Sequence, residues 1–83
     1  MNLIVLTPET EVYNGPIKAV KVPGISGQFE ILKGHAAIVS ALGKGSLRIT
    51  EDNGDQSSYT IQGGFVEVLR NEVSVLVTSV EKE

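Results

Sequence analysis

The sequence GFVEVLRNEVSVLV, at residues 64–77, decides the fold. Valines occupy every second position on either side of Asn71, at residues 66, 68, 73, 75 and 77. A period of two is typical of a strand that has one face against a core. Asn71 favours a turn, so this stretch predicts two short strands with a turn between them.

The same alternation recurs along most of the chain. Apolar residues alternate with polar ones at residues 20–22, 29–31, 47–49 and 59–61. Glycine, proline and asparagine, which favour turns, separate these runs. Val, Ile and Thr make up 23 of the 83 residues, and their branched side chains suit a pleated surface better than a helix. The pattern therefore predicts an all-β fold, as a sandwich or a barrel of short strands.

Three segments allow more specific expectations. Asn53-Gly54 is a pair preferred in two-residue primed turns, so we expect a tight hairpin between residues 47–51 and 57–62. Gly63-Gly64 indicates a bend or a close approach of two backbones, because glycine weakens the interior of a strand. Residues 35–42 fit a helical turn or a buried strand equally well, and we expect them to be extended.

Length, charge and composition restrict the possible functions. With 83 residues, the chain is expected to form one domain over residues 1–83. Its net charge of −3 would repel a phosphate backbone, and four aromatic residues are too few for a base-stacking platform, so we expect no nucleic-acid partner. We expect Tyr59 and Phe65 to fill the core instead. The first apolar run, residues 3–6, is too short for a signal peptide or for insertion into a membrane.

Most chemistries lack the residues that they need. One histidine and no cysteine leave too few ligands for a first-row metal site. His35 and Ser40 could form a hydrolytic triad with Asp52 or Asp55 only if the fold brought them together beside a pocket. No phosphate-binding glycine loop or dinucleotide motif is present, so we expect no cofactor. The sequence favours a binding or structural module whose function lies in its surface.

Several short segments occur in a distinctive order. The most specific are Gly34-His35-Ala36 and the strand start from Gly63 to Val68. The others are Thr7-Pro8-Glu9, Tyr13-Asn14-Gly15, Pro23-Gly24, Gly27-Gln28-Phe29, Leu42 with Gly45, and Val73-Ser74-Val75-Leu76. Together they resemble the amino-terminal domain of the ε subunit of the F-type ATP synthase, over essentially the whole chain. The resemblance implies a two-sheet β-sandwich of short, mostly antiparallel strands.

The resemblance also implies a function and two sets of contact residues. It implies a non-catalytic subunit of the central stalk, or rotor, which couples the c-subunit ring to the γ subunit in a complex that also holds the α and β subunits. Such a subunit is peripheral, on the cytoplasmic face of the bacterial plasma membrane. The positions that correspond to γ contacts are Thr7, His35 and Ser40. The segment that corresponds to the ring contact holds Ser26, Gln28, Phe29 and Glu30, and the family often has acidic residues at the first two of these positions.

Two further expectations concern regulation and the competing function. Typical relatives continue into two carboxy-terminal helices that can inhibit hydrolysis, whereas this sequence ends at Glu83, so we expect coupling without that inhibition. The alternative function is a stand-alone β-sandwich adaptor that pairs an exposed edge strand with a peptide. Recovery of the γ subunit from a membrane extract would distinguish the two.

Overall fold

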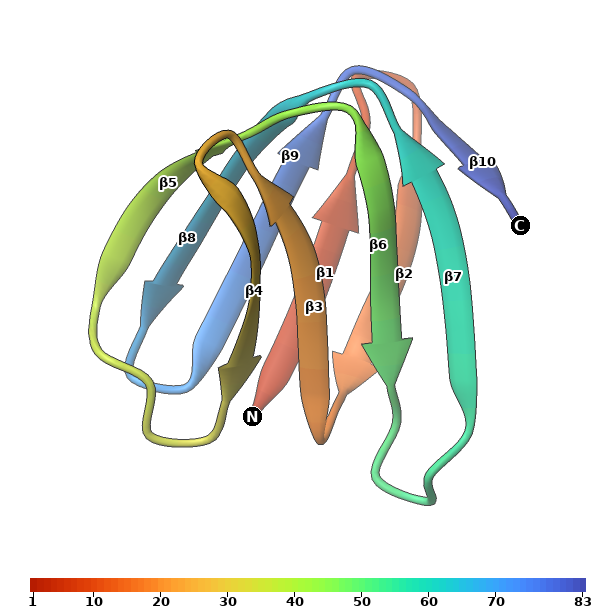
Figure 1. Ribbon diagram of the computed structural model, residues 1–83. Coiled ribbons are helices and arrows are strands. Elements are labelled where there is room, and N and C mark those ends of the chain that lie inside the picture. The colour runs from red at the N-terminus through yellow and green to blue at the C-terminus, as the bar shows by residue number, and fades with distance from the viewer.

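The computed structural model describes residues 1–83 as ten strands without a helix (Figure 1). The strands are β1 (Asn2–Leu6), β2 (Glu11–Pro16), β3 (Ala19–Gly24), β4 (Gly27–Leu32), β5 (Ile38–Leu42), β6 (Gly45–Thr50), β7 (Gln56–Ile61), β8 (Gly64–Leu69), β9 (Glu72–Val77) and β10 (Val80–Lys82). The all-β fold class predicted from the alternation is confirmed. The segment 35–42 is extended from Ile38 onward, and residues 35–37 belong to the loop that precedes β5.

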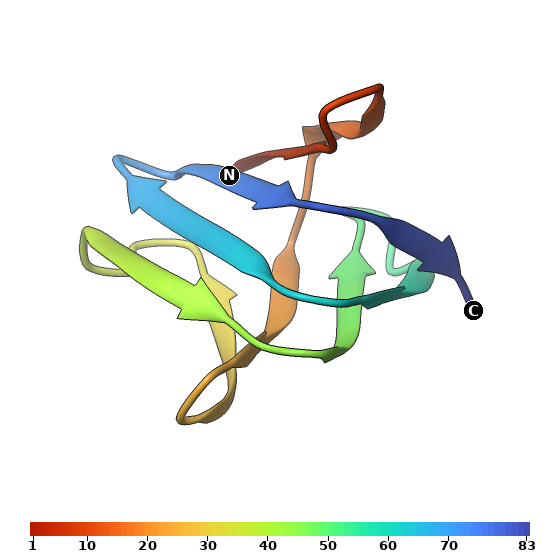
Figure 2. The ribbon, with the colours of Figure 1, turned by 90° about the horizontal axis from the view of Figure 1, so that it is seen from above.

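The strands form one hydrogen-bonded sheet that curls into two layers (Figure 2). One layer has the order β10-β7-β6-β3, with β4 on the other side of β3. The second layer has the order β5-β8-β9-β1-β2. A single residue pair, Gly24 with Leu42, joins β3 to β5 and so links the layers. Strand β1 runs parallel to β9, and the other pairs are antiparallel, so the expected two sheets are the halves of one curled sheet.

The core is aliphatic. Fifteen buried residues form one cluster, and no buried residue is polar. All five alternating valines of β8 and β9 belong to this cluster. The opposite layer contributes Val20 and Val22 of β3, together with Leu47 and Ile49 of β6. Because successive side chains of a strand point to opposite faces, each buried position directs its chain neighbours outward.

Phe65 does not fill the core, so that expectation was wrong. Its side chain is 57% exposed, because it directly precedes the buried Val66 and therefore points to the opposite face of β8. Tyr59 of β7 does pack against the core, as expected. Core filling was expected because the few aromatic residues do not form a stacking platform, but the alternation set by the valines determines where the Phe65 side chain points.

The predicted hairpin between β6 and β7 forms, with a different turn from the expected one. Glu51 N donates to Asp55 O (2.8 Å), and Gly54 N donates to Glu51 O (2.9 Å). Of the loop residues, Gly54 alone has a positive φ. This is the arrangement of a type I turn followed by a left-handed glycine, and not that of a two-residue primed turn. The Asn53 side-chain oxygen stabilises the loop by accepting a hydrogen bond from Asp55 N at 2.9 Å.

Gly64 lies where two backbones approach closely, which is one of the two roles expected for Gly63-Gly64. A Cβ atom at Gly64 would overlap the Leu76 carbonyl oxygen on β9 and would come within 3.0 Å of Val77. The φ of Gly64 is 156°, a value that residues with a side chain rarely adopt. Glycine is therefore required for β8 to start beside the end of β9.

Substitution of Val75 tests the inward face of β9. Val75 has no exposed surface, so Val75→Asp buries an unpaired carboxylate and should lower the free energy of unfolding by about 3 kcal/mol or more. The matched control is Leu76→Asp, because Leu76 is 50% exposed on the other face of the same strand. Chemical denaturation followed by circular dichroism measures both. A Val75→Asp protein as stable as the Leu76→Asp protein would show that the two faces are assigned the wrong way round.

Substitution of Gly64 tests the close approach of β8 and β9. Gly64→Ala should cost about 1–3 kcal/mol of stability, because the added methyl group must displace the backbone of β9. Gly43→Ala is the control, since the nearest atom to a Cβ there is 3.8 Å away, in the Ile25 side chain. We expect that control to change stability by less than about 0.5 kcal/mol. Thermal unfolding compares the two variants, and equal melting temperatures would contradict the steric argument.

Candidate partner-binding surfaces

The outer face of the second layer carries a row of apolar side chains, beside a row that includes Glu67 and Ser74. Phe65 of β8 pairs with Leu76 of β9, and its other neighbour is Ala41 of β5. Leu76 in turn pairs with Leu6 of β1, so four adjacent strands contribute to one apolar row. We call this row, together with the exposed Val39, the apolar face. The exposed fractions are 57% for Phe65, 50% for Leu76 and 70% for Val39.

A hollow of about 400 Å³ lies at one end of the apolar face. Its lining residues come from the ends of β1, β8 and β9 and the turns beside them: Leu6, Thr7, Pro8, Gly64, Phe65, Leu76, Val77 and Thr78. Thr7 marks its border. The Thr7 hydroxyl accepts a hydrogen bond from Thr10 N at 3.1 Å, which fixes the turn between β1 and β2. The hollow can receive an apolar side chain of a partner.

The outer face of the first layer is mostly polar. Lys21 of β3 lies between Glu30 of β4 and Arg48 of β6, and Arg48 pairs with Ser58 of β7. One large apolar side chain, Leu32 at the end of β4, is also exposed there, at 51%. The two outer faces thus differ in chemistry. Large exposed apolar patches typically mark interaction sites in monomeric proteins, and only the second layer presents a row of them.

The three residues that correspond to γ contacts do not form one cluster. Thr7 follows β1 and His35 precedes β5, and these two strands run in the same direction, so the residues lie at opposite ends of the layer. Ser40 lies in the middle of β5 and pairs with the buried Val66. Its side chain therefore shares the inward face, and only Thr7 lines the hollow.

The residues that correspond to the ring contact share one hairpin, formed by β3 and β4. Ser26, Gln28 and Glu30 are exposed, whereas Phe29 is half-buried and packs against the core. At the tip, Ile25 is 71% exposed. The tip is tied to the second layer, because Ile25 N donates to Ala41 O at 3.2 Å. The structure therefore groups these four positions on one hairpin, with three side chains outward and one inward.

Sequence reasoning missed the apolar face. The signal was present in β8 and β9, where Phe65, Leu69 and Leu76 occupy positions between the alternating valines. Both faces of these strands therefore carry apolar residues. The core buries one of these faces and leaves Phe65, Leu69 and Leu76 exposed on the other.

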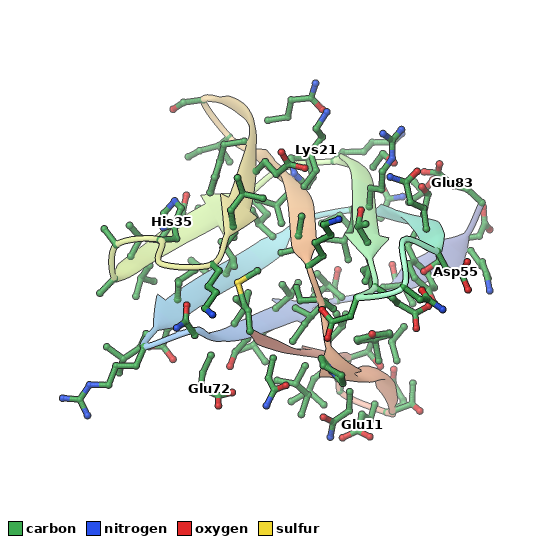
Figure 3. All side chains as sticks on the ribbon, turned by 90° about the horizontal axis from the view of Figure 1, so that it is seen from below. Glu11, Lys21, His35, Asp55, Glu72 and Glu83 are labelled. Carbon is green, nitrogen blue, oxygen red and sulfur yellow. The ribbon has the colours of Figure 1, made fainter.

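The hydrogen bonds do not assemble a triad. His35 Nδ1 lies 2.7 Å from Ala36 O, and the Ser40 hydroxyl donates to Ala41 O at 3.5 Å. Figure 3 shows His35 and Asp55 on opposite sides of the molecule. No three histidine, aspartate or glutamate side chains gather where they could hold a metal ion. No helix has the length and apolarity to cross a membrane.

A polar hollow of about 390 Å³ lies beside the β6–β7 hairpin and is lined by residues 13–16 and 51–53. The Tyr13 hydroxyl donates to Pro16 O at 3.1 Å. Removal from solvent, followed by the charges of Glu51 and Asp52 and a contribution from Tyr59, raises the pKa of Tyr13 above its ordinary value of 10.0. The neutral phenol is therefore the form that the fold favours.

The raised pKa of Tyr13 predicts a pH dependence. Stability linked to this group is present below pH 10.0 and is lost as the pH rises, since the unfolded state releases the proton first. In a Tyr59→Phe background, Tyr13 is the remaining tyrosine, and its tyrosinate absorbance should appear above pH 10.0. Glu51→Gln should lower the pKa of Tyr13, whereas Glu9→Gln should not. Equal titration curves for these two variants would contradict the assigned cause.

Comparison with known proteins identifies the family. Residues 1–83 match the family model of the ATP synthase delta/epsilon chain, β-sandwich domain. The ATP synthase epsilon chain of Synechococcus sp. (strain JA-2-3B'a(2-13)) is 42% identical over 78 residues, which are 94% of this chain and 56% of that protein. The epsilon chain of Chlorobium limicola is 36% identical over 94% of this chain and 89% of its own length. The chain thus spans little more than half the length of the first relative.

Solved structures show the same fold. A chain of the Euglena gracilis mitochondrial ATP synthase, solved as an OSCP/F1/c-ring assembly, has a TM-score of 0.91 at 23% identity over 96% of this chain and 51% of that one. A chain of the Tetrahymena thermophila mitochondrial ATP synthase, solved as central stalk and c-ring, has a TM-score of 0.82 at 21% identity over 96% of this chain and 64% of that one. With the match over all 83 residues, the chain belongs to the β-sandwich domain family of ATP synthase delta and epsilon chains.

Proposed function

We propose that this protein is a non-catalytic central-stalk subunit of the F-type ATP synthase, which couples the c-subunit ring to the γ subunit during proton-driven ATP synthesis. The observation that carries the proposal is the contrast between the apolar face of the second layer and the mostly polar outer face of the first. The similarity to ATP synthase epsilon chains supports it. Catalysis would take place in other subunits, and this chain would act mechanically.

The γ subunit is the partner proposed for the apolar face. Covering Phe65 and Leu76 removes apolar surface from water, at about 25 cal/mol per Å², and a few such side chains typically supply most of the affinity of an interface. Thr7 borders the hollow beside them. Strand β5 meets β3 only at Leu42, so most of its edge is unpaired and Ser40 can be approached from that side. His35 would extend the contact beyond the start of β5.

The ring contact is proposed for the tip of the β3–β4 hairpin. Ile25 and Ser26 are exposed there, and Gln28 and Glu30 follow on β4. The hairpin is supported from the core side by Phe29. Gly43 N donates to Pro23 O at 2.8 Å, so the base of the tip is bonded to the β5–β6 connection. A hairpin tied to both layers can transmit force with little deformation, because packed protein interiors have low compressibility.

The proposed location follows from the proposed partners. The chain would be peripheral, on the cytoplasmic face of the bacterial plasma membrane, where the γ subunit and the polar loops of the ring are accessible. It would reach the α and β subunits through the assembled complex. No cofactor and no nucleic acid take part in the proposed coupling.

Two matched aspartate variants test the proposed γ contact. Leu76→Asp should weaken binding to the γ subunit at least tenfold, because it places a charge in the centre of the apolar face. Leu32→Asp should change the affinity less than about twofold, since Leu32 is equally exposed but lies on the other layer. Biolayer interferometry with immobilised γ subunit measures both, and circular dichroism verifies folding.

Three results would contradict the proposal. Equal losses in the two variants would show that the γ contact is not on the apolar face. A loss confined to Leu32→Asp would place it on the other layer. A wild-type chain that recovers neither γ nor the α and β subunits from a membrane extract would exclude the rotor function and favour a peptide adaptor, which would bind along one of the edge strands.

A further inference from the structure

Asn71 lies in a turn that joins two strands of the apolar face. It follows Arg70, and the φ values are 52° at Arg70 and 63° at Asn71. Two successive positive φ values between paired antiparallel strands are typical of a type I′ hairpin turn. Asparagine is among the few residues with a side chain that adopt this conformation readily. The β8–β9 turn alone thus explains the backbone conformation of Asn71.

The side chain of Asn71 makes a hydrogen bond outside the turn, which the turn itself does not require. Its Oδ1 accepts a hydrogen bond from Gly34 N at 2.9 Å, across 37 positions of the sequence. Its backbone carbonyl accepts a hydrogen bond from Asn2 N, also at 2.9 Å. One residue therefore ties the β8–β9 turn to the start of β1 and to the loop between β4 and β5.

The β4–β5 loop has few other attachments. Strands β4 and β5 do not pair with each other, and the loop crosses from one layer to the other. His35 N donates to Leu32 O at 3.1 Å, which closes a turn within the loop. His35 Nδ1 lies against the carbonyl of its neighbour Ala36. The bond from Gly34 N to Asn71 is therefore the link that fixes this turn to the second layer ahead of β5.

We infer that Asn71 is a positioning residue that holds His35 in the orientation needed for partner binding. The inference rests on the proposed function, since it takes the γ subunit as the partner of His35. An ordered loop loses less conformational entropy when it binds than a free one does, so a fixed loop binds more tightly with the same contacts. Asn71 acts through Gly34 and needs no contact with the partner.

Two substitutions distinguish the role of the Asn71 side chain from the role of its backbone. Asn71→Gly removes the acceptor but keeps the turn, because glycine is preferred in type I′ turns. Asn71→Asp keeps an acceptor oxygen at the same place. In the free protein, NMR hydrogen exchange of the Gly34 amide should become about tenfold faster in Asn71→Gly and stay near wild type in Asn71→Asp, with the Val75 amide unchanged in both.

Binding to the γ subunit completes the test. Loss of the tether should weaken the affinity about three- to tenfold in Asn71→Gly, the range of one hydrogen bond, and Asn71→Asp should restore it. In a His35→Ala background, Asn71→Gly should have no further effect. Faster Gly34 exchange with unchanged affinity, or additive losses with His35→Ala, would overturn the positioning role. Absence of γ binding by the wild-type chain would overturn the proposed function, and the exchange result would still decide whether the tether exists.

Discussion

The alternation of side chains along a strand is the constraint from which the rest of this structure follows. The inward valines of β8 and β9 pack with the aliphatic residues of β3 and β6 in one cluster that contains no polar group. A core of this kind has no side-chain hydrogen bonds that select one arrangement. The arrangement is therefore set by which alternate residues of each strand face inward. Once Val66 and Val75 are buried, Phe65 and Leu76 have to face outward. The same geometry that builds the core therefore creates the apolar face.

The curled sheet also places the two proposed contacts on different layers. The apolar face lies on the outer side of the second layer, and the tip of the β3–β4 hairpin lies at the end of the strands where Thr7 is found. Hydrogen bonds of Ile25 and Gly43 connect this hairpin to the segment around Ala41. Force applied at the tip would therefore pass directly into β5, beside the apolar face. In the proposed role, a domain of this size would transmit force between two partner subunits because its packed interior has low compressibility.

Much of the fold was predictable from the sequence, and the reasons for the failures are physical. Alternating valines predicted β8 and β9 with the correct faces, and Asn53-Gly54 predicted a hairpin but not its type I turn with a left-handed glycine. Phe65 was expected in the core as an aromatic residue, but its place beside the buried Val66 in β8 turns its side chain to the opposite face. The hydrogen bond between Gly34 and Asn71 depends on how distant strands are arranged, which local patterns do not contain. The inward orientation of Ser40 likewise depends on its pairing with Val66.

Side-chain footprinting of the assembled complex tests the central claim most directly. Hydroxyl radicals oxidise exposed aromatic and aliphatic side chains, and the modification of each residue can be compared between the free chain and the chain bound within the ATP synthase. Burial of the apolar face predicts that Phe65 and Val39 become strongly protected on assembly, while Leu32 stays as reactive as in the free chain. Protection of Leu32 with unchanged reactivity of Phe65 would contradict the account.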